Sequence, residues 1–364
     1  MNKFNSIIKF YKFAVIITFN ALLILILFNL ILAGLGMRSI DKRILDYSKT
    51  FPDIEAYRIS APEARSYLKE QDIMRSIPLE YEPWVQFRNP EFHSKHINTD
   101  PKGFRKTKEP KHQSDKYVKV YVFGGSTTFG YGISDNDTIP SYMQKILEEQ
   151  YPNKSVLVKN FGQTCYYSSQ ELLLLISLIK NNDIPDWAVF IDGLNDTNQL
   201  SRLRDEPWLT NQIKNRLDSG IDFSWIPMVR FVKAKFPEKI PKLSIREEDT
   251  QRIVDYVLSR YKKNLEMIQS ICRLYGIKFI FVWQPVPFYK YKKPFHKKFP
   301  HEIDGPHWEK VYSSVADYMH NENFLDLADI FAQTQGKVYV DDVHYNEYAN
   351  EKIASKICAA LEFN

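Results

Sequence analysis

From residue 117 onward, short runs of β-branched and aromatic residues alternate with stretches in which apolar residues recur at helical spacing. Runs of about four to eight such residues, bounded by turn formers, are typical of strands. Strands are predicted at 117–123, 155–160, 187–192, 277–283 and 323–327. The helical spacing predicts helices that begin near residues 139 and 168, and two more over 250–275 and 346–361.

Two of the predicted helices begin with capping residues. Asp137 and Thr138 precede the helix that begins at Ile139, and either side chain is placed to accept a hydrogen bond from the first turn. Ser168 and Glu171 form a capping-box pattern before the apolar run LLLLISLI. Both patterns strengthen the assignment of these segments as helices.

Alternating strands and helices predict an α/β fold in which a parallel sheet is covered on both faces. Such sheets bind ligands at the carboxyl ends of their strands. Polar segments stand at those ends in this chain. They are Ser126 after the first strand, Asn160-Phe161-Gly162 after the second, Gly193-Leu194-Asn195-Asp196 after the third, and Asp341-Asp342-Val343-His344 before the last helix. We expect these four segments to converge on one edge of the sheet.

The N-terminal segment has a different pattern, because residues 13–36 contain no charged side chain. A helix of that length rises about 36 Å, enough to cross the hydrocarbon core of a bilayer. The apolar core of a secretory signal is shorter, so the pattern favours an uncleaved single-pass membrane anchor. A helix buried in a protein core is the alternative interpretation.

The anchor divides the chain into a short tail (1–12), a transmembrane helix (13–36), a connector and lead-in (37–115) and an α/β domain (116–364). The lead-in carries scattered prolines and no sustained period, and we expect it to pack against the domain. Lysines precede the anchor and basic residues follow it, so the positive-inside rule barely decides its orientation. We expect a cytoplasmic tail and an extracytoplasmic domain.

Composition narrows the function only slightly. The net charge of +5 is small, with acids and bases interspersed, and no zinc-finger or RNP-like pattern occurs, so we expect no nucleic-acid partner. The cysteines Cys165, Cys272 and Cys358 lie too far apart for a CxxC pair or a disulfide framework. The histidines at 296, 301 and 307 lack metal-site spacing, so neither a metal nor another cofactor is expected.

The stretch VYVFGGSTTFGYG, residues 120–132, admits three interpretations. A phosphate-binding loop needs G-x-x-x-x-G-K-[ST], but Tyr131 stands where the lysine belongs. The dinucleotide fingerprint G-x-G-x-x-G is absent. The third interpretation makes Ser126 a nucleophile, which needs a base within hydrogen-bond reach.

His344 is the candidate base for Ser126. Asp341 precedes His344 by three residues, so a turn can bring its carboxylate to Nδ1, where it would fix the tautomer and stabilise the imidazolium. The neighbouring Asp342 is a second candidate for this role, although the spacing favours Asp341. The sequence thus offers a Ser-His-Asp triad scattered over more than two hundred positions.

Attack on an ester carbonyl also requires hydrogen-bond donors aimed at the developing oxyanion. The backbone N–H groups of Ser126 and Gly162 and the side-chain amide of Asn195 are the candidates. Each candidate has a structural alternative: Ser126 can cap a helix, Asn195 can form an Asx turn, and His344 can be an ordinary residue at a helix start. The order of the four segments argues against all these alternatives holding together.

The four segments together resemble the SGNH, or GDSL-like, hydrolase family over about residues 117–364. Gly124-Gly125-Ser126 matches the nucleophile block, Asn160-Phe161-Gly162 the N-x-G block, Gly193 to Asp196 the G-x-N-D block, and Asp341 to His344 the D-x-x-H block. The resemblance implies a three-layer α/β/α fold, flavodoxin-like in topology, and hydrolysis or transfer of acyl esters. It implies Ser126 as nucleophile, His344 as base, Asp341 as its orienter, and an oxyanion hole formed by Ser126, Gly162 and Asn195.

The sequence also departs from the family, because Gly125 stands where the common first block has aspartate. The lead-in INTDPKGFR (97–105) and the GGSTTFG variant resemble membrane-anchored bacterial members, often linked to envelope or exported polysaccharides. We therefore expect an esterase that removes acetyl or similar groups from a carbohydrate. The alternatives are an O-acyltransferase, which would need a multi-pass partner to supply the acyl donor, and a non-catalytic glycan-binding or scaffolding module.

Two insertions, 197–249 and 285–322, are expected to cover the cleft and select the substrate. Within the second, residues 287–299 interleave aromatic side chains with lysines. Such a segment suits an anionic glycan or lipid headgroups, and a solvated lysine-rich loop is an equal alternative.

Overall fold

The structure, a computed structural model, describes residues 2–50, 53–198, 226–229, 250–291, 307–319 and 323–363. The chain divides into two compact units, Met1–Asp46 with Lys214–Lys242, and Tyr47–Ile213 with Leu243–Asn364. Most of the first predicted insertion (197–249) lies outside the described residues, as do 292–306 and 320–322 of the second, which include much of the lysine-rich stretch 287–299.

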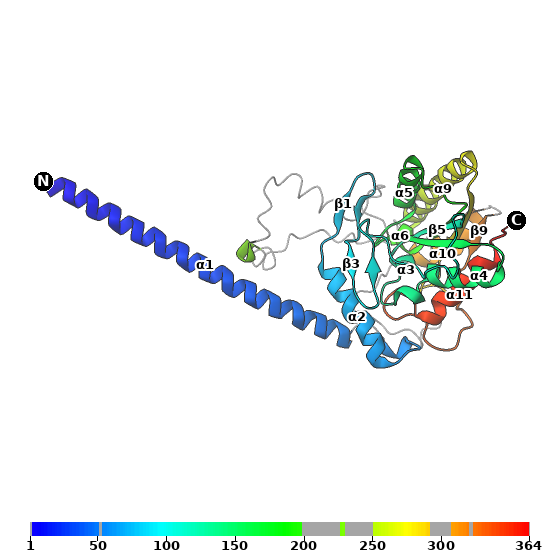
Figure 1. The fold of residues 1–364 in the computed structure, drawn as a ribbon, viewed down its shortest axis with the longest axis horizontal. Helices are drawn as coiled ribbons and strands as arrows, with labels where there is room; N and C mark the ends of the chain where they lie inside the picture. Colours follow the sequence, from blue (N-terminus) through cyan, green and yellow to red (C-terminus); the bar gives the residue numbers. More distant parts are fainter. Residues whose placement is uncertain are drawn as a thin grey trace. The chain divides into compact units, whose positions relative to one another are not determined.

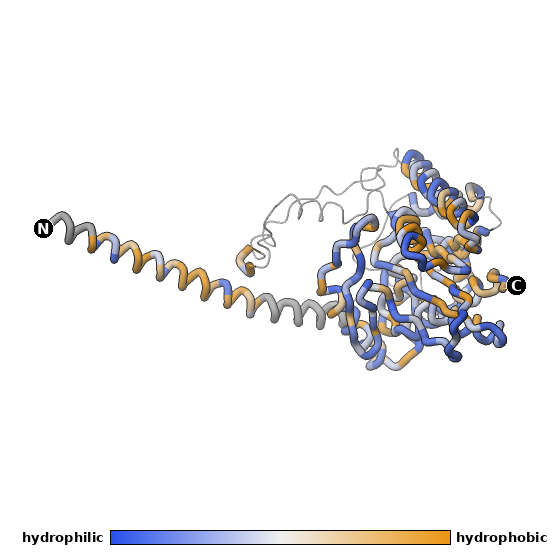
Figure 2. The backbone as a smooth tube through the Cα atoms, turned by 45° about the horizontal axis from the view of Figure 1, so that its top comes forward, coloured by the Kyte–Doolittle hydropathy of each residue, from blue (hydrophilic) through white to orange (hydrophobic). Residues whose placement is uncertain are grey.

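The first unit contains most of helix α1 (Asn2–Thr50). Its segment Ile8–Leu35 has a mean hydropathy of 2.7 and none of it is buried. Figure 2 shows this segment as a largely apolar stretch of helix. In the described part of the chain it is the one helix that is long and apolar enough to cross a membrane, and it overlaps the predicted anchor 13–36.

The second unit is built on a parallel sheet of five strands (Figure 1), in the spatial order β6-β5-β7-β8-β9. The strands are β5 (Val118–Gly124), β6 (Val156–Gly162), β7 (Trp187–Asp192), β8 (Lys278–Trp283) and β9 (Phe324–Asp326). The five predicted strands and the parallel α/β fold are therefore confirmed. When the five strands are numbered by their order in the chain, their order across the sheet is 2-1-3-4-5, which is the flavodoxin-like order.

Helices cover both faces of the sheet and make three layers. One face packs against α5 (Ser168–Lys180), α9 (Thr250–Leu274) and α10 (His307–Tyr318), and the other against α4 (Ile139–Gln150) and α11 (Glu347–Ala359). Successive side chains of a strand point to opposite faces. In β5, Tyr121 and Phe123 accordingly join the first core, and Val120 and Val122 join the second.

The two predicted caps have different outcomes. Thr138 caps α4, because its side chain accepts a hydrogen bond from the backbone N–H of Ser141, so that prediction is confirmed. The capping box at Ser168 and Glu171 is wrong. Helix α5 begins at Ser168 after Tyr167, which makes no side-chain cap, and Glu171 is buried against Asp192 instead.

The lead-in is more regular than the sequence indicated. It contains a 3-10 turn η1 (Ile54–Ala56), helix α2 (Ala61–Ser76) and two short hairpins, β1 (Glu80–Glu82) with β2 (Gln86–Arg88), and β3 (Phe92–His93) with β4 (Asn98–Thr99). Helix α2 was not predicted from the sequence. From residue 53 these elements belong to the same compact unit as the sheet.

A buried arginine joins the lead-in to the segment that follows β5. Arg105 donates to the carboxylate of Asp135 at 2.5 Å and to the backbone carbonyls of Gly130 and Ile133. Its side chain has no exposed surface. Removing one partner of a buried ion pair leaves an uncompensated charge, so this contact should matter for stability.

We expect Arg105→Met to lower the free energy of unfolding by about 3 kcal/mol, because Asp135 and two carbonyls would lose a buried donor. Urea denaturation of the full chain in detergent, followed by tryptophan fluorescence, measures the loss. The neighbouring Lys106→Met is the matched control, since Lys106 forms an exposed pair with Glu109. Equal effects of the two substitutions would contradict this account.

Candidate active site

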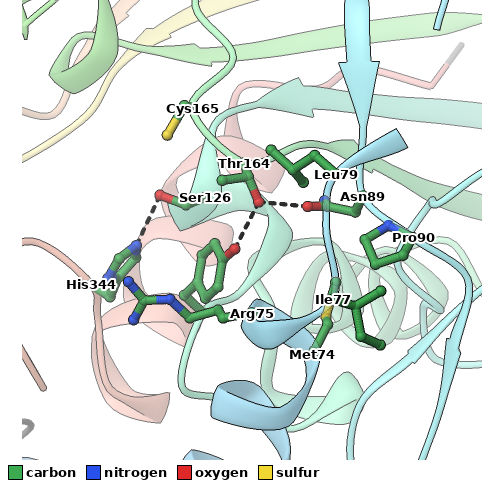
Figure 3. Close-up of a pocket in the computed structure, with 11 residues that line it drawn as sticks. Met74, Arg75, Ile77, Leu79, Asn89, Pro90, Ser126, Thr164, Cys165 and His344 are labelled. Carbon is green, nitrogen blue, oxygen red and sulfur yellow. Dashed lines mark hydrogen bonds between the residues drawn. The ribbon is translucent and has the colours of Figure 1, made fainter. Parts of the chain in front are cut away.

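The structure brings the three predicted triad side chains into direct contact. Ser126 is the first residue of the short helix α3 (Ser126–Phe129), directly after β5 and Gly125. Its Oγ lies 2.8 Å from Nε2 of His344 (Figure 3), and Nδ1 of His344 lies 2.7 Å from Oδ2 of Asp341. Because a carboxylate accepts the Nδ1–H, Nε2 is left as the acceptor for the serine hydroxyl.

Asp341 is held by its own turn as well as by the imidazole. Its Oδ1 accepts the backbone N–H groups of Val343 and His344, at 3.0 and 2.8 Å. Burial acts to raise the pKa of Asp341. The charge and hydrogen bond of His344 and the two backbone donors outweigh it and lower the pKa to about 2. The imidazole thus contacts Asp341, the candidate that the spacing favoured over Asp342.

Gly125, which precedes Ser126, lies against Asn195. A Cβ atom at this position would lie 2.2 Å from Nδ2 of Asn195 and 3.1 Å from the carbonyl oxygen of Tyr166. A larger side chain there would have to displace the amide of Asn195, so glycine allows the close approach that the structure shows. The amide of Asn195 therefore packs directly against the backbone that carries Ser126.

Asn195 lies at the start of α6 (Leu194–Asn198), and its Nδ2 donates to the carbonyl of Tyr166 at 2.7 Å. The next residue, Asp196, ties this helix to its neighbours. Its carboxylate accepts the hydroxyl of Ser168, and its carbonyl accepts a guanidinium N–H of Arg260. Asn195 is thereby held in place beside Gly125.

Three carboxyl groups are buried behind Asn195: Glu171, Asp192 and Asp196. Burial raises the pKa of Glu171 well above its usual value, and the charges of Asp192 and Asp196 raise it further. The pKa of Asp192 is raised mainly by burial and then by Asp196. Asp192 also accepts the hydroxyl of Tyr261 at 3.2 Å. In the described part of the chain, no group of three or more histidine, cysteine, aspartate or glutamate side chains is arranged so that it could hold a metal ion.

The backbone N–H of Gly162, the third candidate oxyanion donor, already has a hydrogen-bond partner. Its N–H donates to Oδ1 of Asn160 at 2.9 Å, and a Cβ atom would lie 2.4 Å from the backbone nitrogen of Phe129. Asn160 in turn donates to the carbonyl of Thr128 at 3.0 Å. The N-x-G segment therefore packs against the end of α3 and fixes the helix that begins at Ser126.

A cavity of about 280 Å³ opens at Ser126 and His344. One wall comes from the end of α2 and the segment that follows it, and the other includes Thr164 and Cys165 (Figure 3). Tyr131 also lines the cavity. Sequence reasoning missed this second wall. Cys165 adopts a left-handed backbone with φ 59°, which glycine usually signals, but no glycine marks this position.

The segment before α2 supports the loop that carries Asp341 and His344. Asp53 donates its backbone N–H to the carbonyl of Val340 and accepts an ion pair from Lys337 at 2.7 Å. Asn346 donates to the carbonyl of Ala56 at 2.6 Å. We call residues 53–58 the loop clamp, because their contacts fix both ends of the loop.

No family model matches the sequence, and no curated protein matches it. Solved structures do match. A putative lipolytic protein of the G-D-S-L family from Desulfitobacterium hafniense is 12% identical with a TM-score of 0.36, over 67% of this chain and 99% of that one. Axe2, an acetylxylan esterase from Geobacillus stearothermophilus, is 15% identical with a TM-score of 0.37, over 68% and 95%. The acetyl xylan esterase AlAXEase is 16% identical with a TM-score of 0.37, over 67% and 100%. At these identities and TM-scores the likeness carries no inference about activity.

The lowered pKa of Asp341 predicts a pH-dependent contribution to stability. The ionised carboxylate stabilises the fold above about pH 4, and this stabilisation, about 2 kcal/mol, is lost as the pH falls from about 4 toward 2. We expect the wild-type advantage over Asp341→Asn in the free energy of unfolding to shrink between pH 6 and pH 2.5. Urea titrations at both pH values measure it.

The exposed Asp115 provides the control for this comparison. Asp115→Asn should change the free energy of unfolding by less than about 0.5 kcal/mol at either pH. A gap between wild type and Asp341→Asn that stays constant with pH would rule out the ionised carboxylate as its source.

Proposed function

We propose that this chain is a membrane-anchored serine esterase of the SGNH type that removes short acyl groups, such as acetyl, from the hydroxyl groups of a carbohydrate. The observation that carries the proposal is the hydrogen-bond chain from Ser126 Oγ through the imidazole of His344 to the carboxylate of Asp341. This arrangement supplies a nucleophile, a base and the group that orients the base.

The first half of the reaction forms an acyl-enzyme. Ser126 Oγ attacks the ester carbonyl carbon while Nε2 of His344 takes the hydroxyl proton, and Asp341 stabilises the imidazolium. The tetrahedral intermediate then collapses. Its bond to the alcohol oxygen breaks, and the alcohol leaves with the proton from Nε2, so the acyl group remains on Ser126.

The second half returns the enzyme to its starting state. Water attacks the acyl carbonyl carbon as it gives a proton to Nε2 of His344. The bond between the acyl carbon and Ser126 Oγ then breaks, the acid is released, and the proton on Nε2 returns to Ser126. One ester and one water give one acid and one alcohol.

The oxyanion formed in both halves requires preorganised donors. The proposed donors are the backbone N–H of Ser126 and the side-chain amide of Asn195, which is packed against Gly125. Gly162 would join them by releasing the N–H that Asn160 accepts. Removing one such donor in other hydrolases costs roughly 10²–10³ in kcat.

Two further observations support the finer parts of the proposal. The cavity of about 280 Å³ lies just below the roughly 300–1,000 Å³ range of ordinary ligand pockets, a size that suits a short acyl group. The apolar helix α1 supports membrane attachment. The proposal places the catalytic unit on the extracytoplasmic side.

We expect Ser126→Ala to lower kcat for p-nitrophenyl acetate by roughly 10⁴-fold, because no other hydroxyl replaces the nucleophile. The assay uses the full chain in detergent. A fluorophosphonate should label the wild type, and mass spectrometry of the digested protein should find the adduct on the peptide that contains Ser126.

Ser355→Ala is the matched control, since Ser355 is exposed on α11 and bonds only to its own helix in the described structure. It should keep wild-type turnover and labelling. Ester turnover that survives in Ser126→Ala, or a fluorophosphonate adduct at another residue, would reject Ser126 as the nucleophile. The absence of both turnover and labelling in the wild type would reject the esterase.

A further inference from the structure

One charged side chain lines the cavity at Ser126 and His344. Among the described residues that form its walls, Arg75 is the only lysine, arginine, aspartate or glutamate. Arg75 lies in the last turn of α2, and more than a third of it is exposed, so it stands where the cavity meets solvent. The carboxylate of Asp341 lies behind His344 and is occupied by the imidazole and two backbone donors.

An aromatic ring fixes the place of this charge relative to the triad. The guanidinium carbon of Arg75 lies 5.7 Å from the ring centroid of Tyr131, within the range of a cation–π contact. The Tyr131 ring lies 5.2 Å from the ring of His344. Figure 3 shows the Arg75 side chain extending toward His344 across the cavity. The Tyr131 ring therefore contacts both the guanidinium of Arg75 and the imidazole of His344.

The ring of Tyr131 is itself held firmly. Its hydroxyl shares a hydrogen bond of 2.7 Å with the hydroxyl of Thr164, which donates to Oδ1 of Asn89 at 2.5 Å. Asn89 is almost fully buried. The Tyr131 ring that contacts the guanidinium is thus a fixed part of the cavity wall.

The acidic neighbour of Arg75 on its own helix does not line the cavity. Asp72 lies three residues earlier in α2, where burial raises its pKa to about 6 and the charge of Arg75 opposes that rise. Among the described residues, the walls present one cation and no acidic side chain. This charge distribution attracts an anion and repels a second cation.

We infer that the site prefers acyl esters whose alcohol portion carries an anionic group, a carboxylate or a phosphate, which Arg75 binds while the ester carbonyl lies at Ser126. This inference rests on the proposed esterase function and names its substrate class. A guanidinium suits both groups, because its planar fork pairs with two oxygens at once. Solvent and salt screen a partly exposed charge, so the preference should be moderate and salt-dependent.

Three acetyl esters of matched shape test the preference: 3-acetoxybenzamide, 3-acetoxybenzoate and 3-acetoxyphenyl phosphate. Hydrolysis of each by the full chain in detergent gives acetate and a phenol. At low salt we expect kcat/KM for at least one anionic ester to exceed that for the amide by roughly three- to tenfold. The effect should appear mainly in KM, because a contact remote from the reacting bond binds ground state and transition state alike.

The comparison of the benzoate with the phosphate decides which anion the site takes. A preference for either anionic ester over the amide supports the inference. The ester with the larger kcat/KM ratio relative to the amide shows which anion the site prefers. In 0.5 M NaCl both ratios should fall toward one.

Substitutions of Arg75 test whether this residue causes the preference. Arg75→Gln should bring the ratio of anionic to neutral ester close to one, and Arg75→Lys should keep part of it, because an ammonium retains the charge but loses the fork. Arg65→Gln is the matched control, since Arg65 is an exposed arginine of the same helix that does not line the cavity. It should keep the wild-type ratio.

The outcomes separate the two proposals. Equal kcat/KM for charged and neutral esters in a wild type that labels at Ser126 overturns the inference and leaves the esterase standing. A preference that Arg75→Gln retains also overturns it. A wild type that neither turns over any ester nor labels at Ser126 overturns the esterase, and this inference with it.

Discussion

The hydrogen bond between Ser126 and His344 joins two segments 218 positions apart, and the rest of the site is arranged around it. A parallel sheet makes the contact possible, because all its strands end on one edge. β5 delivers the serine to that edge, and the loop before α11 delivers the imidazole. Gly125, Asn195 and Asp341 each serve this contact, by allowing close approach, filling the space beside the serine, or holding the ring.

Many of the polar contacts that stabilise the site are made by residues around the triad rather than by the triad itself. Asn160 fixes the end of α3, Thr127 donates to Gln284 at the end of β8, and Asp196 ties α6 to α5 and α9. None of these side chains needs to touch a substrate. These supporting side chains explain why the four polar segments contain more residues than those that line the cavity. Holding the serine and the imidazole in place requires additional polar contacts around them.

Much of this arrangement could be predicted from the sequence, because its signals are local. β-branched runs marked the strands, and the polar residues after them marked the edge. Helix α2 was missed because the polar Gln71 interrupts its buried face, although the cap of Ser60 on Glu63 was a visible signal. The capping box at Ser168 failed because tertiary contacts claimed its side chains. The position of Arg75 beside the triad has no sequence signal, since it depends on how α2 docks.

The loop clamp has a consequence for how such a chain can change. Thr50 is the last residue of α1, and Asp53 already contacts the carbonyl of Val340, one position before Asp341. Exchanging the apolar helix for another segment is therefore safe only upstream of this junction. A chimaera joined a few residues later, at the start of α2, would keep the whole sheet and the side chains of Ser126, His344 and Asp341. It would lack the loop clamp, whose contacts support the loop that carries His344.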